Sequence, residues 1–542
     1  MKEVKEGDLD PQKTLVKDLT KRLGASLSSY VVDNFKLDLD SIINTSEIAG
    51  TGFDASVWTE KASGKTYVAL RGTDFNIQDL LTDSDLALTG GAQDQIASMV
   101  NWWLASTTPI GEQALQIKYQ VTTTTNFVNW VEAPSIEGTG TLAGIMDISV
   151  TGHSLGGHLA SAFTRLFGGQ WNIEHTSTFN SAGFTASSEA IFNQIEALLG
   201  DGMGLGRYPD GNEQSNYFSE NGINVVTNTF YFDQIGTRIP LFNEDSSLGV
   251  PNHFVAPLTD TLALGNMLAG LDSSFNIAQL NRLMAASSNA ADASQETMLD
   301  HLGRLFVGDH ITETPLGSVV SGRNSDIFYQ NLFILQAQLF QNPNDIDLVA
   351  KGEYQGMSLV NLGDYTASNT LAENAKTTIG FMYALENLLP FALTNADAVY
   401  QAHNKNGQLD PNQFSEQYIG DRAGLLYWKL KYDLTDTSYG SYINPDDFDD
   451  TSSFEGNWSY RDLSQNITLN IDGNGTDVYR QIIFGNFYHL LSSHPPPFIK
   501  PPKINQQFNA AITSFQLNVQ QSSVITDMAA TYVHYHRRTG DF

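Results

Sequence analysis

A serine between two glycines is the first place where this chain could do chemistry. Gly152-His153-Ser154-Leu155-Gly156 has the pattern Gly-x-Ser-x-Gly. The β-branched run 148–150 comes before it, and residues 159–167 carry apolar side chains at helical spacing after it. A sharp turn between a strand and a helix exposes a serine as a nucleophile, beside the N–H groups of the helix start. The pattern predicts nucleophilic catalysis by Ser154; the alternative is a small-residue turn that packs a helix onto a sheet.

A serine nucleophile needs an acid and a base, and the acid is predicted first. Asp233 follows the long apolar run 223–232, which predicts a buried strand. Asp233 would then lie at the carboxyl end of a strand, as Ser154 does. In parallel α/β sheets, ligands bind at that edge of the sheet. The order serine, then aspartate, then histidine is the one that hydrolases with this serine pattern use.

Three histidines are candidates for the base, because those within four residues of Ser154 are too close to it in sequence. His253 lies 20 residues after Asp233 (253 − 233), just before the apolar helix predicted over 258–271. His301 falls inside a predicted helix and His310 in a predicted loop. His253 is therefore favoured, with His301 and His310 as alternatives. A neutral histidine would take the serine proton and return it to the leaving alcohol.

The oxyanion of such a reaction needs two hydrogen-bond donors. Residues 53–73 predict a hairpin whose second strand ends at Arg71-Gly72-Thr73. We expect the N–H of Thr73 to pair with the N–H of Leu155 as the oxyanion hole. The alternative for Thr73 is an ordinary turn at the end of a strand.

The elements that must position these residues alternate between strand and helix over residues 53–270. This alternation predicts an α/β fold with a mostly parallel sheet covered on both faces. A helix over 93–104 carries Trp102 and Trp103, which we expect in the core rather than on a lipid-facing lip. The Thr- and Gly-rich stretch 106–147 is expected to be an insertion or a cover over the site.

The rest of the chain predicts an accessory region after a catalytic domain of residues 1–300. Residues 301–485 read as helices followed by strands, and 486–542 as a Pro-rich linker and tail. Two acidic loops, Asp472–Asp477 and Asp446–Asp450, could bind calcium through Asp472, Asp477 and their neighbours, although such loops are more often plain turns. The predicted ester chemistry itself requires no cofactor.

Composition excludes several classes of function. The 542 residues carry a net charge of −31, so binding to nucleic acid through its phosphates is excluded. There is no cysteine, hence no disulfide, and no run reaches the roughly 18 apolar residues of a membrane span. The charged start 1–6 lacks the pattern of a Sec signal peptide. We expect a secreted bacterial protein that is exported without that signal, with a cytoplasmic location as the alternative.

Arg71-Gly72-Thr73, followed by Asp79–Asp83 and then Gly152–Gly157, resembles the class 3 lipase superfamily over about residues 50–270. Shorter pieces resemble the lipase modules that precede calcium-binding RTX repeats in secreted bacterial proteins; these pieces are 179–184, 252–254 with 258–264, 383–391 and 421–423. The repeats themselves are missing, apart from the single stretch at Asp472. In that family the threonine of the first motif serves the oxyanion hole.

The resemblance implies an α/β-hydrolase fold and a triacylglycerol lipase that works at a lipid–water interface. The His-x-x-x-x-Leu-Thr-Asp piece supports His253 as the base. Phospholipase A1, a short-chain esterase and a polyester hydrolase are alternatives with the same chemistry. The non-enzymatic alternative is an inactive module of a secreted adhesin or toxin, in which the serine-containing fold is only a scaffold.

Overall fold

A computed structural model describes most of the first 430 residues and two later strands. The described ranges are 11–44, 52–71, 91–122, 127–184, 188–220, 233–242, 255–287, 294–308, 311–314 and 325–430 without 346, 388, 408, 415, 417–418, 421, 425 and 428–429, with the strands 458–462 and 467–471. The chain forms two compact units. The first is Met1–Leu262 with Ser318–Tyr329, and the second is Ala263–Gly317 with Gln330–Phe542. The sequence suggested a boundary near residue 300.

The first unit contains a seven-stranded sheet, a separate pair of strands and four helices among its described residues. Its elements are α1 (Pro11–Asn34), β1 (Phe35–Asn44), β2 (Asp54–Glu60), β3 (Thr66–Arg71), α4 (Gly91–Thr107), β4 (Gln113–Thr122), β5 (Phe127–Glu137), β6 (Asp147–His153), α5 (Leu155–Phe167), β7 (Asn172–Phe179), α6 (Ser188–Leu199), β8 (Gln214–Ser219) and β9 (Thr237–Leu241). Two further helices, α7 (Val255–Leu271) and α10 (Ser325–Leu339), belong partly to each unit.

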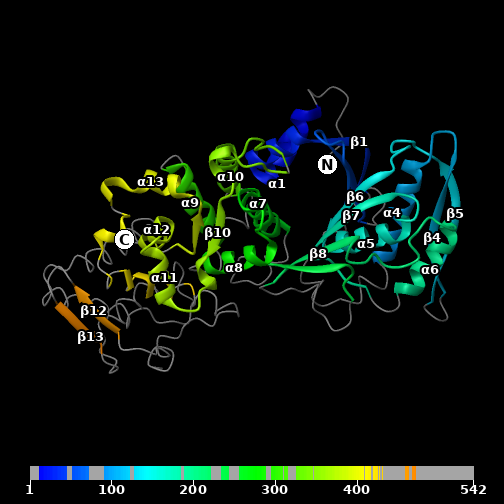
Figure 1. Ribbon diagram of the computed structural model, residues 1–542. Coiled ribbons are helices and arrows are strands. Elements are labelled where there is room, and N and C mark those ends of the chain that lie inside the picture. Colours follow the sequence, from blue (N-terminus) through cyan, green and yellow to red (C-terminus); the bar gives the residue numbers. More distant parts are fainter. Residues whose placement is uncertain are drawn as a thin grey trace, which may run out of the picture. The chain divides into compact units, whose positions relative to one another are not determined.

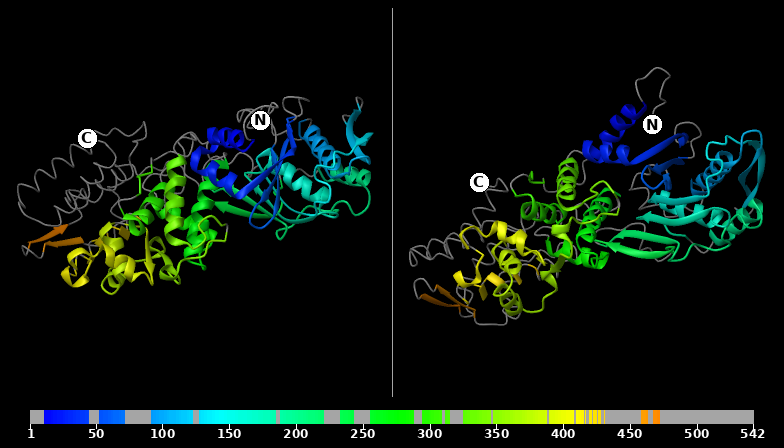
Figure 2. Two further views of the ribbon diagram at one scale, coloured as in Figure 1. Left: turned by 90° about the horizontal axis from the view of Figure 1, so that it is seen from above. Right: turned by 45° about the horizontal axis from the view of Figure 1, so that its top comes forward.

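The sheet is mostly parallel, as predicted. Its strand order is β1-β2-β3-β6-β7-β8-β9, and every pair from β3 to β9 is parallel, whereas β1 and β2 are antiparallel additions. Successive right-handed crossovers in one direction place the connecting helices on one face of a sheet. Accordingly, α5 packs on β3, β6 and β7, with α4 and α6 beside it (Figure 1, Figure 2).

One face of the sheet faces the main core of this unit. On β6, Ile148 and Val150 are buried, whereas the intervening side chains are partly exposed. Trp103 is fully buried with its ring 4.8 Å from that of Phe163, and Trp102 is also buried, so the prediction of a core position is confirmed. The expected helical cover on both faces is not what the described residues of this unit show, because all three crossover helices lie on the same side.

The stretch expected as an insertion folds as a ribbon of two antiparallel strands, β4 and β5, outside the main sheet. It packs against α4 and α6. The Asn101 side chain fixes it to α4, since its Nδ2 donates to the Ile117 carbonyl at 2.9 Å and its Oδ1 accepts the Ile117 N–H at 2.7 Å. A function of this ribbon as a cover stays a prediction.

Strand β8 was missed, because residues 200–216 are rich in glycine, aspartate and asparagine, a composition that predicts a loop. Its inward side chains are polar: Gln214 and Asn216 are fully buried. Gln214 Nε2 donates to Ser161 Oγ at 2.8 Å, and Asn216 Nδ2 donates to the side chain of Gln234. A buried face made of amides gives no apolar alternation for sequence patterns to detect. The strand predicted over 223–232 lies outside the described residues.

The second unit is helical with small strand pairs. Its elements are α8 (Ile277–Ser287), α9 (Ser294–Phe306), η4 (Gly352–Tyr354), β10 (Ser358–Asn361), η5 (Leu362–Asp364), α11 (Ser368–Ala375), α12 (Ile379–Asn387), β11 (Phe391–Thr394), α13 (Asp397–His403), η6 (Lys405–Gly407), η7 (Pro411–Gln413), β12 (Trp458–Asp462) and β13 (Ile467–Ile471). The strands β12 and β13 pair antiparallel and confirm the predicted change to β structure.

The mostly helical pattern of residues 368–389 forms two helices, α11 and α12, with a break between them. The hydroxyls of Thr377 and Thr378 both donate to the Asn374 carbonyl there, at 3.1 and 2.7 Å. Such local side-chain bonds compete with the helix. Pro390 then leads into β11, which pairs with β10. No helix in the described part of the chain is long and apolar enough to cross a membrane.

Candidate active site

Ser154 occupies a strained turn between β6 and α5. Its backbone angles are φ 55° and ψ −123°, and it is one of three residues other than glycine with positive φ in the described chain. Such a conformation costs of order 1–3 kcal/mol and persists only where the surroundings enforce it. The predicted turn is therefore present, and it holds a serine where glycine would be less strained.

The flanking glycines are required by close contacts. A Cβ at Gly152 would lie 2.0 Å from the Gly156 carbonyl oxygen, and a Cβ at Gly156 would lie 2.3 Å from the Leu70 carbonyl oxygen. A Cβ at Gly157 would lie 2.8 Å from the Ser181 Cβ. The turn is thus closely packed by backbone of β3 and by the side chain of Ser181, which follows β7.

Backbone hydrogen bonds fix the serine and the start of the helix. The Ser154 N–H donates to the Phe179 carbonyl at 2.9 Å, and the Ser154 carbonyl accepts from the N–H groups of Gly157 at 3.0 Å and Ala182 at 3.2 Å. Leu155 is the first residue of α5. Its N–H is one of the amides at a helix start that have no acceptor within the helix, at the positive end of the helix dipole.

The end of β3 lies beside this turn. Leu70 pairs with Gly152 and Arg71 with His153 in the parallel register of β3 and β6. The chain therefore leaves β3 next to the nucleophile turn. Thr73, the predicted second oxyanion donor, lies outside the described residues.

Asp233 is brought to the same region through its backbone. It forms a bridge with Phe184, with N–H···O distances of 2.9 and 2.8 Å in the two directions. Phe184 comes two residues after Ala182, which donates to the Ser154 carbonyl. Asp233 is exposed and precedes β9 by four residues (237 − 233). The strand predicted over 223–232, at whose end Asp233 is expected, lies outside the described residues.

Of the three candidate bases, His301 is the one that lies among the described residues. His253 and His310 lie outside the described residues. His301 is partly buried within α9, in the second unit, and its predicted helical position is confirmed.

His158, one turn after Ser154, positions the neighbouring loop. Its ring is stacked on Phe184, with centroids 4.1 Å apart, and its Nδ1 lies 3.2 Å from the Gly183 carbonyl. A carbonyl can only accept, so Nδ1 carries the proton. Burial lowers the pKa of His158 to about 4, which keeps the ring neutral at pH 7. Sequence reasoning gave this residue no role, although its i+4 spacing from Ser154 places it next on the same face.

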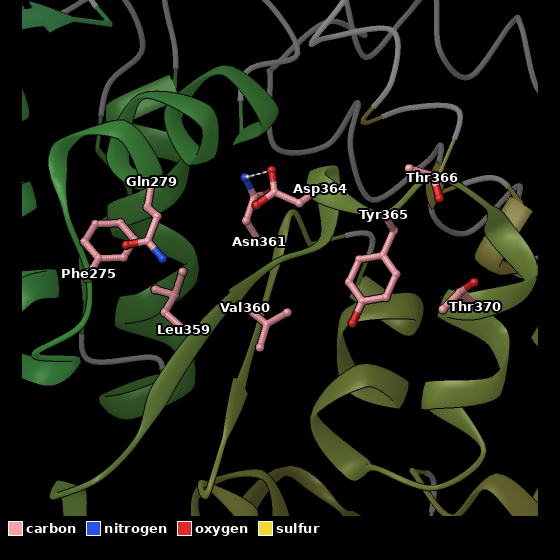
Figure 3. A pocket seen from close by; sticks show the side chains of 9 residues that line it. All are labelled: Phe275, Gln279, Leu359, Val360, Asn361, Asp364, Tyr365, Thr366 and Thr370. Atoms are coloured by element: carbon pink, nitrogen blue, oxygen red, sulfur yellow. Dashed lines mark hydrogen bonds between the residues drawn. The ribbon is translucent and has the colours of Figure 1, made fainter.

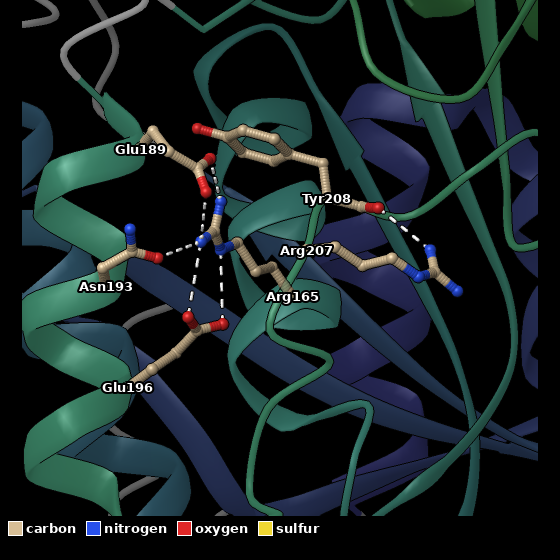
Figure 4. Close-up of polar contacts among 6 residues, drawn as sticks. All are labelled: Arg165, Glu189, Asn193, Glu196, Arg207 and Tyr208. Carbon is tan, nitrogen blue, oxygen red and sulfur yellow. Dashed lines mark hydrogen bonds and ion pairs between the residues drawn. The ribbon is translucent and has the colours of Figure 1, made fainter.

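At the other end of α5, Arg165 anchors the helix to α6 (Figure 4). Its fully buried guanidinium donates to Glu189 at 2.6 and 3.1 Å, to Asn193 at 2.8 Å and to Glu196 at 3.3 Å. The ring of Tyr208 lies 4.5 Å from it, and burial raises the pKa of Tyr208 to about 12. Sequence reasoning missed this cluster; the signal was an arginine inside an otherwise apolar helix.

No group of three or more His, Asp or Glu side chains in the described ranges is arranged to hold a metal ion. The predicted calcium ligands Asp472 and Asp477, and the acidic run 446–450, lie outside those ranges. Calcium binding therefore stays a prediction.

Comparisons with protein-family models, with curated proteins and with solved structures give no match to this chain.

Proposed function

We propose that this protein is an α/β-hydrolase that cleaves carboxylic esters of lipids through Ser154, with triacylglycerols as the first substrate class. The observation that carries the proposal is the backbone of Ser154, at φ 55° and ψ −123° between a parallel strand and a helix start. A turn that only packed a helix onto a sheet would be less strained with glycine at this position. A serine that is held there at a cost of order 1–3 kcal/mol indicates that its hydroxyl has a task.

In the proposed reaction Ser154 Oγ attacks the ester carbonyl carbon, while His253 takes the hydroxyl proton. The tetrahedral intermediate collapses, the ester C–O bond breaks, and His253 returns the proton to the leaving alcohol. Water then attacks the acyl carbonyl carbon while His253 takes its proton, the bond from that carbon to Ser154 Oγ breaks, the fatty acid is released and the proton returns to Ser154 Oγ. Asp233 orients the imidazole and stabilises its charged form. His301 and His310 are the alternative bases.

The proposed oxyanion hole consists of the N–H groups of Leu155 and Thr73. Leu155 supports it through its place as the first residue of α5. For Thr73 the support is chain geometry. Arg71, two residues earlier in the chain, pairs with His153 in the register of β3 and β6, and its Cα lies only 3.1 Å from a Cβ built on Gly156.

The test of the proposal is covalent labelling of the full-length protein with a fluorophosphonate ester. Such a probe forms a stable bond only with an activated serine. We expect the wild type to be labelled and Ser154→Ala to remain unlabelled, with circular dichroism showing that both are folded. An unlabelled wild type, or equal labelling of the two proteins, would reject the enzyme and favour the inactive module.

The substrate class is tested on the same preparation. Triglycerides of several chain lengths, phosphatidylcholine and a p-nitrophenyl ester of a short acid are compared at equal protein concentration. We expect turnover of triglyceride emulsions to exceed that of the other two. Faster release of fatty acid from phosphatidylcholine would make the protein a phospholipase A1, and turnover of the soluble ester alone would make it a short-chain esterase.

A further inference from the structure

The second unit contains a pocket of about 400 Å³ that is separate from the serine site (Figure 3). One side is formed at the start of α8, and the rest runs from β10 through η5 to the first turn of α11. The lining residues are Phe275, Gln279, Leu359, Val360, Asn361, Asp364, Tyr365, Thr366 and Thr370. Ligand pockets for small molecules have volumes of roughly 300–1,000 Å³, so the volume suits a single small ring rather than a lipid chain with its headgroup.

Apolar surface lines two sides of the pocket. Phe275 and Leu359, each 8% exposed, lie on one side, and the ring of Tyr365 lies on the other (Figure 3). Phe381 packs edge-on against the Tyr365 ring, with centroids 5.9 Å apart, which fixes its orientation. A flat ligand with apolar faces could therefore lie between these two sides.

The polar groups of the pocket are held in place by bonds of their own. Asn361 Oδ1 accepts the Gly363 N–H at 2.9 Å, and its Nδ2 donates to Asp364 Oδ1 at 3.4 Å. Gln279 Oε1 accepts the Asn276 N–H at 2.9 Å, so the amide nitrogen is the end that points toward the pocket (Figure 3). These planar groups each present two positions for hydrogen bonds with fixed geometry.

The pocket is close to electrically neutral in a strongly acidic protein. Of its nine lining side chains only Asp364 is charged at neutral pH. Arg282 holds that carboxylate with two hydrogen bonds, from Nε at 2.9 Å and from Nη2 at 3.3 Å. Because Arg282 already pairs with the one lining carboxylate, an ionic ligand would have to compete with that ion pair, whereas a neutral ligand with several hydroxyls would find both donors and acceptors.

We infer that this pocket binds a neutral sugar, as a free hexopyranose or as the end of a glycan. A pyranose ring offers C–H groups on its faces and hydroxyls around its rim. The faces contact Phe275 and Tyr365, while neighbouring hydroxyls bond to the amides of Gln279 and Asn361 and to the hydroxyl of Thr370. This binding is independent of ester hydrolysis at Ser154.

The experiment titrates full-length protein with glucose, galactose, mannose and N-acetylglucosamine, followed by calorimetry and saturation-transfer NMR. Thr370→Trp is the blocking variant, since this exposed residue lies in the first turn of α11 and lines the pocket. Asn369→Trp is the matched control. It introduces the same tryptophan one position away, at an exposed residue that does not line the pocket. Ser154→Ala is titrated in parallel, which separates this site from the proposed hydrolase site.

We expect at least one of the four sugars to bind with a Kd of about 1–10 mM. Thr370→Trp should weaken that binding by at least about tenfold, whereas Asn369→Trp and Ser154→Ala should bind as the wild type does. Tyr365→Ala, which removes one apolar wall, should weaken it similarly and serves if Thr370→Trp does not fold. Absence of saturable binding by all four sugars, or undiminished binding in the folded pocket variants, would overturn the inference.

Discussion

At the scale of single residues, the nucleophile turn is the part of the site that sequence reasoning could predict best. Gly152 and Gly156 have backbone atoms within 2.3 Å of where a Cβ would be, so no other residue type fits and the spacing is visible in the sequence. The other members of the proposed site come from distant segments. Asp233 approaches through a bridge to Phe184, a pairing that no local pattern encodes. Close contacts within the turn restrict residue types at fixed spacings that are visible in the sequence, whereas pairings between distant segments leave no such pattern.

The base is the first residue that mutation can assign. We expect His253→Ala to lose nearly all turnover, because the serine hydroxyl then has no proton acceptor; removal of a general base typically costs about 10²–10⁴-fold. His301→Ala should keep most of its turnover, since His301 lies within α9. Steady-state hydrolysis of a short p-nitrophenyl ester measures both. If His301→Ala lost most of its turnover while His253→Ala stayed active, His301 would be the base. If both variants stayed active, His310 would be the remaining candidate.

His158 gives a prediction for acid stability. Its pKa lies near 4 in the folded protein, below the ordinary value of 6.5, because burial disfavours the charged ring. Above pH 6.5 the ring is neutral in both states and its contribution to stability is complete. As the pH falls from 6.5 toward 4, the unfolded chain takes up a proton that the folded protein excludes, so the free energy of unfolding decreases. At about 1.4 kcal/mol per pKa unit the loss reaches about 3 kcal/mol.

Urea unfolding at about pH 7.5 and about pH 5 measures the part of this loss that falls between the two pH values, about 2 kcal/mol. His158→Phe keeps a flat ring on Phe184 but cannot be protonated, so its stability should change less between the two pH values than that of the wild type. His175→Gln is the control, because His175 is only partly buried and bonds to Ser215 at 2.9 Å. An unchanged pH dependence in His158→Phe would mean that other groups cause the acid sensitivity.

At the scale of elements, α5 is fixed at both ends, by the nucleophile turn and by Arg165. Arg165→Ala should destabilise the protein by about 3–5 kcal/mol, since it removes a fully buried, fully hydrogen-bonded guanidinium and leaves the mostly buried Glu196 carboxylate without its cation. Glu189→Gln should cost less than about 1 kcal/mol, because the Glu189 side chain is 49% exposed. Glu196→Gln should fall between them, as that side chain is 16% exposed. Chemical denaturation of the three variants checks the order; equal effects of Arg165→Ala and Glu189→Gln would contradict it.

The elements also show which secondary structure can be predicted from apolar sequence patterns and which cannot. Strands and helices with one apolar face, such as β6 and α5, were predicted near their observed bounds. Strand β8 was missed because its buried face consists of Gln214 and Asn216, whose burial depends on partners elsewhere in the fold. The break between α11 and α12 was missed because threonine hydroxyls, rather than a proline or a glycine, cap the first helix.

At the scale of the whole molecule, 60 acidic and 29 basic residues leave a charge of −31, which opposes compaction through self-repulsion. Sodium chloride screens this repulsion, so the melting temperature should rise with ionic strength, by roughly 2–4 °C for each kcal/mol that is relieved. Thermal unfolding followed by circular dichroism in increasing salt measures the effect. A melting temperature that is independent of salt would show that the acidic groups are too far apart to repel one another appreciably.

A specific effect of calcium on stability is distinguished from general screening by comparing calcium chloride and sodium chloride at the same ionic strength. Screening acts equally for both salts, whereas a bound ion stabilises the folded state by RT ln(1 + [L]/Kd) and saturates. We expect calcium chloride to raise the melting temperature beyond sodium chloride of the same ionic strength, and chelation to reverse only that excess. The excess should disappear in the variant Asp472→Asn, Asp477→Asn if those carboxylates bind the ion. Equal melting temperatures in the two salts would reject the calcium site and leave screening as the whole effect of added salt.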